Sequence, residues 1–201
     1  MTSPRFDDLK KLPTHPAARI IAHNNIVLQT PVTAPASATV AQLLSELHEK
    51  GAVIDMMQLL AHALPPRETT WWACLSARDL LPDGSDKLTP SIKAAEDWVL
   101  QPSEETRALA RAALDSAPND DDTVFCAMAA TFADGTLGPG EYEDYDAPPG
   151  AVGSAAFSIA LIAMFDREDE TETRATLLLE RALDISRGGS GQVNPLTFSE
   201  H

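Results

Sequence analysis

The sequence predicts an all-α fold, a compact multi-helix bundle of about eight helices preceded by an irregular N-terminal arm. From residue 39 onwards, apolar side chains recur every three or four residues, which is the period of an amphipathic helix. Capping residues, glycines and prolines stand at the boundaries of these segments. No convincing strand ladder and no repeat of fixed period is found, so a compact bundle is favoured over a solenoid.

The first 38 residues are expected to form the irregular arm. Five of them are prolines, which lack a backbone N–H and interrupt helices. One short segment, residues 25–32, is a candidate for an extended strand. The all-α domain is expected to cover residues 39–188, and residues 189–201 are expected to be a loose tail.

The first three helices are expected to follow one another closely. The first covers residues 39–50 and ends at Gly51, a residue typical of helix C-termini. The second covers residues 52–64. The two prolines that follow end it and supply the fixed backbone angle with which the third helix, extending to residue 81, begins.

The other five expected helices have recognisable ends. Thr89 and Ser103 are N-cap residues of the fourth and fifth helices. Three consecutive aspartates, residues 120–122, precede the sixth and are interpreted as caps, since a calcium-binding loop would need a different spacing and a distal glutamate. The last two helices cover residues 151–165, almost wholly apolar, and residues 169–188.

Two adjacent tryptophans, Trp71 and Trp72, lie in the third helix. At about 100° per residue, small side chains fall on one face of this helix and the tryptophans on the other. We therefore expect helices to pack on both faces, with Glu68 or Asp79 available to accept an indole hydrogen bond. The alternative is a partner-binding face, because Trp and Arg dominate binding hot spots, and it makes Trp71, Trp72 and Arg78 binding candidates.

A long non-helical stretch follows Gly135, with glycines and prolines on either side of an acidic centre. Loops of more than about 12 residues are uncommon in compact domains and are often functional. We expect a surface loop that packs through Leu137, Tyr142 and Tyr145. The same three residues, together with Glu143 and Asp144, are candidates for partner binding.

The net charge of −15 is concentrated in one half of the chain. Residues 1–100 hold nine Lys/Arg and eleven Asp/Glu, whereas residues 101–201 hold six and nineteen, a balance of −13. Such a surface repels nucleic acid and anionic membranes and attracts a basic protein. The alternative is that the acidity only maintains solubility.

No catalytic, cofactor-binding or metal-binding motif is found. The five histidines match neither a zinc spacing nor the partner of a nucleophilic serine, so no enzyme activity, cofactor or metal is expected. A site assembled from scattered residues such as His62, Glu68 and Arg78 is the alternative. Two cysteines, expected to be core side chains, and the lack of a signal or membrane segment favour a cytoplasmic location.

Five segments carry a resemblance to known proteins: "LLAHALPPRETTWWACLSARDL", "AAEDWVLQPSEETRALARAAL", "AMAATFADGTLGPG", "APPGAVGSAAFSIALIAM" and "ERALDISRGGSG". They are similar to a family of bacterial proteins of unknown function, many of which are encoded near type VI secretion genes. The resemblance implies a non-enzymatic accessory protein that binds a secretion component or an effector as adaptor or chaperone. The alternative is an acidic immunity protein that inhibits a basic toxin.

Overall fold

The computed structural model describes residues 3–82, 85 and 87–193. Helical residues make up 61% of this part of the chain and form nine α-helices and three short 3-10 helices. The described residues contain no strand, only an isolated bridge between Thr136 and Asp146. The predicted fold class is confirmed. One of these nine helices was not among the eight expected. It is α1 (Ala17–His23), which lies within the arm that was expected to be irregular.

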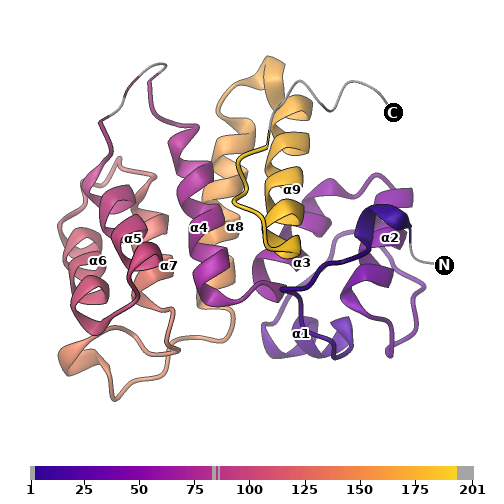
Figure 1. The fold of residues 1–201 in the computed structure, drawn as a ribbon, viewed down its shortest axis with the longest axis horizontal. Helices are drawn as coiled ribbons and strands as arrows, with labels where there is room; N and C mark the ends of the chain where they lie inside the picture. The colour runs from indigo at the N-terminus through magenta and orange to yellow at the C-terminus, as the bar shows by residue number, and fades with distance from the viewer. Residues whose placement is uncertain (1–2, 83–84, 86, 194–201) are drawn as a thin grey trace.

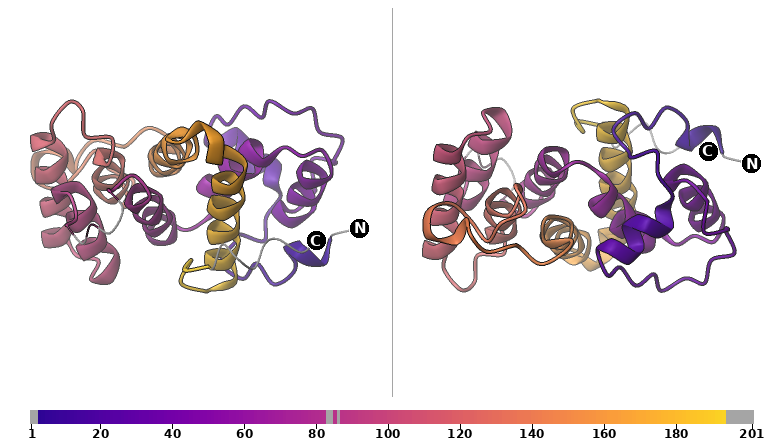
Figure 2. Two further views of the ribbon diagram at one scale, coloured as in Figure 1. Left: turned by 90° about the horizontal axis from the view of Figure 1, so that it is seen from above. Right: turned by 90° about the horizontal axis from the view of Figure 1, so that it is seen from below.

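The helices form three groups along the long axis of the molecule (Figure 1). One end contains α1, α2 (Val40–Glu49) and α3 (Val53–Ala63). The other end contains α5 (Pro90–Leu100), α6 (Glu104–Ser116) and α7 (Val124–Thr131). Between them lie α4 (Pro66–Arg78), α8 (Ala151–Phe165) and α9 (Thr171–Arg187), as the views from above and below also show (Figure 2).

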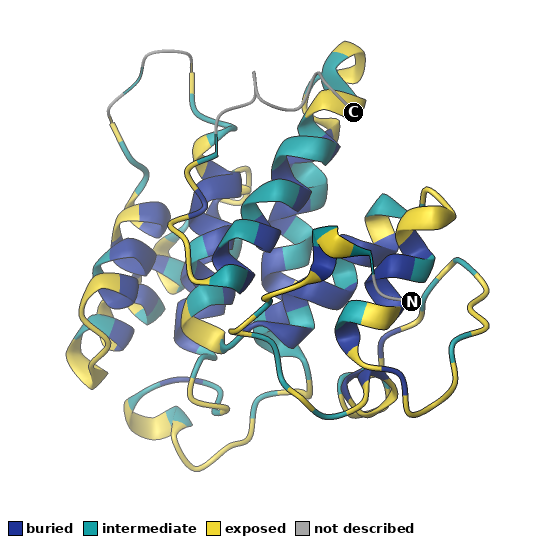
Figure 3. Ribbon diagram, turned by 45° about the vertical axis from the view of Figure 1, so that its right-hand side comes forward, coloured by how far each residue is buried: buried dark blue, intermediate teal, exposed yellow. Residues whose placement is uncertain are grey.

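The helix that carries the tryptophan pair is central. α4 packs against α5 and α7 on one side and against α8 and α9 on the other. Its small face, with Ala73, Cys74 and Ala77, and its large side chain Trp72 are all fully buried. Buried residues occur in all three groups of helices (Figure 3), and they make up most of α4. The predicted packing on both faces is confirmed, although the helix ends at Arg78 rather than at residue 81.

The apolar composition of α8 follows from its position. It packs against α3, α4, α7 and α9, so neighbouring helices surround most of its circumference. Seven of its fifteen residues are buried and six are half-buried, and only Ser154 and Phe165 are exposed, so few positions of α8 need a polar side chain. Nowhere in the described part of the chain is there a helix whose length and apolar character would let it cross a bilayer.

A side-chain cap marks the start of three of the nine described α-helices. The Thr89 and Ser103 hydroxyls each accept a hydrogen bond from a backbone N–H in the first turn, as predicted, and the Thr39 hydroxyl does the same at the start of α2. The aspartates before α7 differ from the expectation. The N-cap of α7 is Thr123, and the Asp121 carboxylate accepts a bond from its backbone N–H at 3.0 Å, which stabilises the preceding turn and not the helix end itself.

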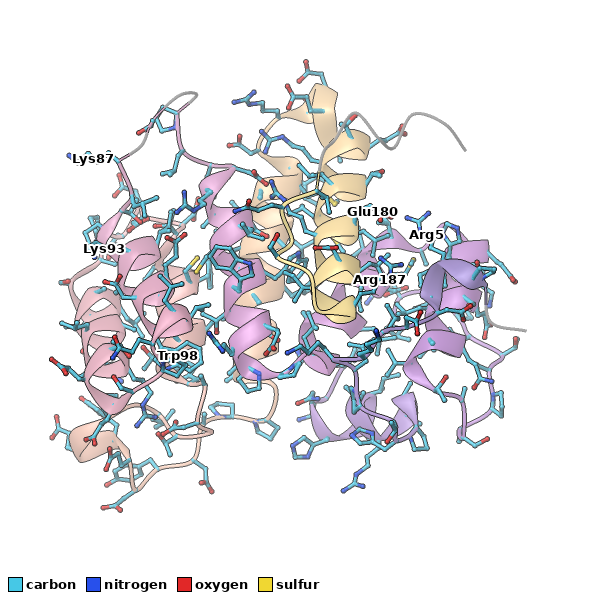
Figure 4. The ribbon with its side chains drawn as sticks, viewed as in Figure 1. Arg5, Lys87, Lys93, Trp98, Glu180 and Arg187 are labelled. Atoms are coloured by element: carbon cyan, nitrogen blue, oxygen red, sulfur yellow. The ribbon has the colours of Figure 1, made fainter. Side chains whose placement is uncertain are left out.

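The N-terminal segment packs against the bundle. Phe6 is fully buried and its ring meets the His48 ring edge to face at a centroid distance of 5.6 Å. Arg5 forms an ion pair with Glu180 and accepts a hydrogen bond from Arg187 through its carbonyl, and all three side chains are visible in Figure 4. The arm is therefore part of the core, which corrects the expectation of a wholly irregular segment.

Two carboxylates hold the segment that was considered as a strand. Asp55, which is buried in α3, accepts hydrogen bonds from the backbone N–H groups of Gln29 and Thr30 at 2.9 and 2.8 Å. A little further along the chain, the backbone amides of Thr33 and Ala34 donate to Glu46 of α2 at 2.6 and 2.7 Å. The Gln29 and Thr30 amides therefore bond to a side chain and not to a neighbouring strand, and residues 25–32 form no strand.

The anchor at Glu46 makes stability depend on pH. Hydrogen bonds from Lys50 and from the Thr33 backbone lower the pKa of Glu46 from 4.5 to about 2. Since its pKa is lower in the folded chain than in the unfolded one, its stabilising effect is complete above about pH 4.5 and disappears as the pH falls towards 2. We expect denaturant unfolding to show Glu46→Gln less stable than the parent protein at pH 7, with the difference shrinking below pH 4.5. A difference that stays constant down to pH 2 would contradict this assignment.

The chain after α9 begins with an ordered turn. Gly188 has a left-handed φ of +98° and ends the helix, as predicted. Gly191 is buried, and its N–H donates to the Asp184 carboxylate at 2.8 Å. A Cβ at this position would lie 2.7 Å from Leu75 Cδ1, so the turn packs closely on α4. Residues 189–193 are thus not a loose tail, and residues 194–201 lie outside the described residues.

Candidate functional site

The two tryptophans have different surroundings. Trp72 is fully buried and its Nε1–H donates to the Leu178 carbonyl at 3.0 Å. Trp71 is half-buried and its Nε1–H donates to the Ser190 carbonyl at 2.7 Å. Both acceptors are main-chain carbonyls, not the carboxylates expected on α4. Trp72 therefore presents no surface to a partner, and Trp71 presents only part of its ring.

The third candidate on α4, Arg78, is joined to α5. Its Nε and one terminal nitrogen donate to the two Glu96 oxygens at 2.6 and 2.8 Å. These hydrogen bonds raise the pKa of Arg78. The guanidinium thus links two helices.

The three residues considered as a scattered catalytic site, His62, Glu68 and Arg78, do not lie together in the structure. Glu68 pairs with Lys11, and Arg78 pairs with a carboxylate of α5. These two positions are ten residues apart on α4, which is about 15 Å along the axis. His62 lies in α3 and has hydrogen-bond partners of its own. The three side chains do not form one site.

His62 packs between two helices. Its Nδ1 lies 2.8 Å from the Gln58 carbonyl, so this nitrogen carries the proton, and its Nε2 lies 3.3 Å from the Ser154 hydroxyl of α8. Burial lowers the pKa of the imidazole, which favours its neutral form. Gly153 lies directly against the ring, since a Cβ there would be 2.5 Å from His62 Cδ2.

The acidic loop, residues 136–146, is closed at its base. The N–H of Leu137 donates to the Tyr145 carbonyl, and the N–H of Ala147 donates to the Gly135 carbonyl, both at 2.8 Å. A 3-10 turn, Gly140–Tyr142, forms its tip. These bonds give the loop a defined backbone between α7 and α8.

Two arginines of α6 hold the loop in place. Arg107 is only 6% exposed, forms ion pairs with Asp134 and Glu143, and donates to the Thr136 hydroxyl at 3.1 Å. Arg111 donates to the Leu137 carbonyl at 3.0 Å, and its guanidinium carbon lies 4.1 Å from the centre of the Tyr142 ring. Sequence reasoning missed both arginines. The feature of the sequence that could have revealed them is their spacing of four residues, which puts both arginines on one helix face beside an acidic segment.

The loop side chains fall into two sets. Leu137 and Tyr142 are half-buried, which agrees with the expected packing, and Glu143 is paired with an arginine. Tyr145 is 61% exposed, so it does not pack as predicted. Asp144 is exposed, as are Glu141 and Asp146, and within the described residues none of these three carboxylates has an ion-pair partner.

The acidic loop and α4 both lie within a segment that matches a protein family. A family of unknown function, DUF6931, matches residues 43–186, which is more than half of the chain. The chain belongs to DUF6931. The DUF6931 region begins in α2 and ends in the last turn of α9, so it contains every predicted binding residue and leaves out the N-terminal arm. No curated protein and no solved structure matches the chain.

A groove of about 850 Å³ lies beside the base of the acidic loop. Gly135, Asp146 and the start of α8 supply one wall from within the DUF6931 region, and α1 supplies another from outside it. The junction of α3 and α4 also lines the groove. Its volume is within the range of about 300–1,000 Å³ typical of ligand sites.

The cysteines lie elsewhere in the DUF6931 region. Cys74 and Cys126 are both fully buried, as predicted, and burial raises the pKa of the Cys74 thiol. A raised pKa disfavours the reactive thiolate. In the part of the chain that the structure describes, His, Cys, Asp and Glu side chains form no cluster of three or more that could hold a metal ion.

Proposed function

We propose that this chain is a non-enzymatic accessory protein of a bacterial type VI secretion system, which acts in the cytoplasm as an adaptor or chaperone. Its acidic loop recognises a basic surface of a secretion component or effector. The observation that carries the proposal is the combination of an ordered loop, unpaired carboxylates and an exposed Tyr145. The assignment to secretion rests on the resemblance of the sequence segments described above.

The way in which the loop is held suits it to binding. Arg107 pairs with Asp134 and Glu143, and the loop carboxylates that have no ion-pair partner among the described residues are exposed. A loop that is already ordered loses little conformational entropy on binding, which favours affinity. Tyrosine is enriched at binding hot spots, and complementary charge accelerates encounter.

An acidic immunity protein is the second candidate, and the same loop supports it. In that role the carboxylates and Tyr145 would cover the basic active site of a toxin. The two functions differ in what the partner does: an immunity protein abolishes the activity of its partner at a 1:1 ratio, whereas an adaptor leaves it active.

The proposal is tested first by capturing the partner from the native bacterium and then by measuring association rates at increasing salt. We expect the rate of the parent protein to fall as salt rises, because ions screen the attraction. Neutralising Glu141, Asp144 and Asp146 together (to Gln, Asn and Asn) is expected to slow association about tenfold at low salt and to remove most of the salt dependence.

The matched control removes three exposed carboxylates outside the loop, through Glu49→Gln, Asp122→Asn and Asp169→Asn. It changes the net charge by the same amount and is expected to change the rate only slightly. Equal effects of the two triple variants would reject the loop as the recognition element. An assay of the captured partner's own activity then decides between adaptor and immunity protein.

A further inference from the structure

The groove beside the acidic loop is formed by three segments that are distant in the sequence. α1 and the loop lie on either side of the ends of α4 and α8 (Figure 1), and the groove lies between them. The apolar part of its lining includes Ile20 of α1, Leu64 at the end of α3, Phe132 after α7 and Val152 of α8. Such side chains provide contact area for an apolar stretch of a ligand.

The floor of the groove is tightly packed. A Cβ added at Gly153 would lie 2.5 Å from the His62 ring, and a Cβ added at Gly150 would lie 3.0 Å from Asn24 Cβ. The polar groups of the floor are satisfied: the Thr69 hydroxyl, for example, lies within hydrogen-bond distance of two backbone carbonyls. A floor of this kind keeps its shape when a ligand binds, which lowers the entropic cost.

The polar groups that remain available lie on the rims. On the α1 side, the side chains of Arg19 and His23 have no hydrogen-bond or ion-pair partner within the described residues. On the loop side, the Asp146 carboxylate is exposed and unpaired as well. The groove therefore has the Arg19 cation on one rim, the Asp146 carboxylate on the other and apolar side chains in the lining between them.

We propose that this groove binds an extended peptide segment of the partner protein, whose acidic side chain faces Arg19 and His23 and whose basic side chain faces Asp146, with apolar residues between. Opposite charges on the two rims fix the direction of the peptide, because the reversed order places like charges together. This inference rests on the proposed function, since the acidic rim is the base of the recognition loop.

The test uses synthetic fluorescent peptides, measured by anisotropy. Each contains one lysine and one glutamate separated by two to six leucine and proline residues, in both orders. We expect one order to bind the parent protein at least tenfold more tightly than the other. Arg19→Glu or Asp146→Lys alone is expected to weaken that peptide at least tenfold, and the two together are expected to invert the preferred order.

Lys10→Glu is the control, because Lys10 is an exposed lysine outside the groove with no ion-pair partner among the described residues. It makes the same charge change as Arg19→Glu and is expected to leave peptide binding unchanged. No binding by any peptide, or equal losses from the Lys10 and Arg19 variants, would overturn the proposal. The proposed function would survive that result if the captured partner still depended on the loop carboxylates for association.

Discussion

Replacing Trp72 with alanine is expected to lower the free energy of unfolding by about 3–5 kcal/mol. The side chain is fully buried between helices, so its removal loses apolar contact and leaves a cavity at the centre of the bundle. It also removes the hydrogen bond to the Leu178 carbonyl. For a chain of this length, each kcal/mol corresponds to about 2–4 °C in Tm, so thermal and denaturant unfolding both resolve the effect.

The neighbouring Trp71→Ala variant is the matched control. Trp71 is half-buried and contacts the turn after α9 through one hydrogen bond, so a clearly smaller loss of stability is expected. A Trp72→Ala protein that melts at the parent temperature but loses partner binding would show that Trp72 belongs to a binding surface, contrary to its burial in α4.

Gly153→Ala is expected to destabilise the protein by about 1–3 kcal/mol. In an exposed helix the same change stabilises by about 1 kcal/mol, because alanine has the higher helix propensity. Here the new Cβ would lie 2.5 Å from His62 Cδ2 and 3.0 Å from the Ala61 carbonyl oxygen. The ring is held by its bond to Gln58 and cannot turn away freely, so steric overlap outweighs propensity.

A double-mutant cycle with His62→Ala isolates this contact. Removing the ring opens space for the new methyl group, so Gly153→Ala is expected to cost little or to stabilise in the His62→Ala background. Denaturant unfolding of the four proteins gives the coupling free energy. The same cost in both backgrounds would show that the overlap with His62 is not the cause.

The positions of the eight expected helices follow from local sequence. The apolar run at residues 151–165 coincides with α8, and Thr89 and Ser103 begin the helices that they were expected to cap. Capping and amphipathic period act within one or two turns, so a single sequence contains them in full. The packing of α4 on both faces followed from the same arithmetic.

The candidate site was only partly accessible from the sequence. Its glycines, prolines and carboxylates revealed the acidic loop, and its composition indicated exposure. Which residues hold the loop was not evident, because Arg107 and Arg111 lie in a different helix, 36 and 26 residues before the loop residues Glu143 and Leu137 that they contact. That Arg19 and Asp146 have no ion-pair partner among the described residues likewise depends on every neighbour that the fold brings near them.

The helical class, most helix boundaries and the uneven charge can all be predicted from the sequence, since each depends on residues close together in the chain or on composition. The order of the N-terminal segment, the surroundings of the tryptophans and the position of the groove depend instead on how the helices pack. α1 has seven residues, too few for a stable isolated helix, and Trp71 bonds to a carbonyl 119 residues away. Such features depend on contacts between distant segments, which form only when the whole chain has packed.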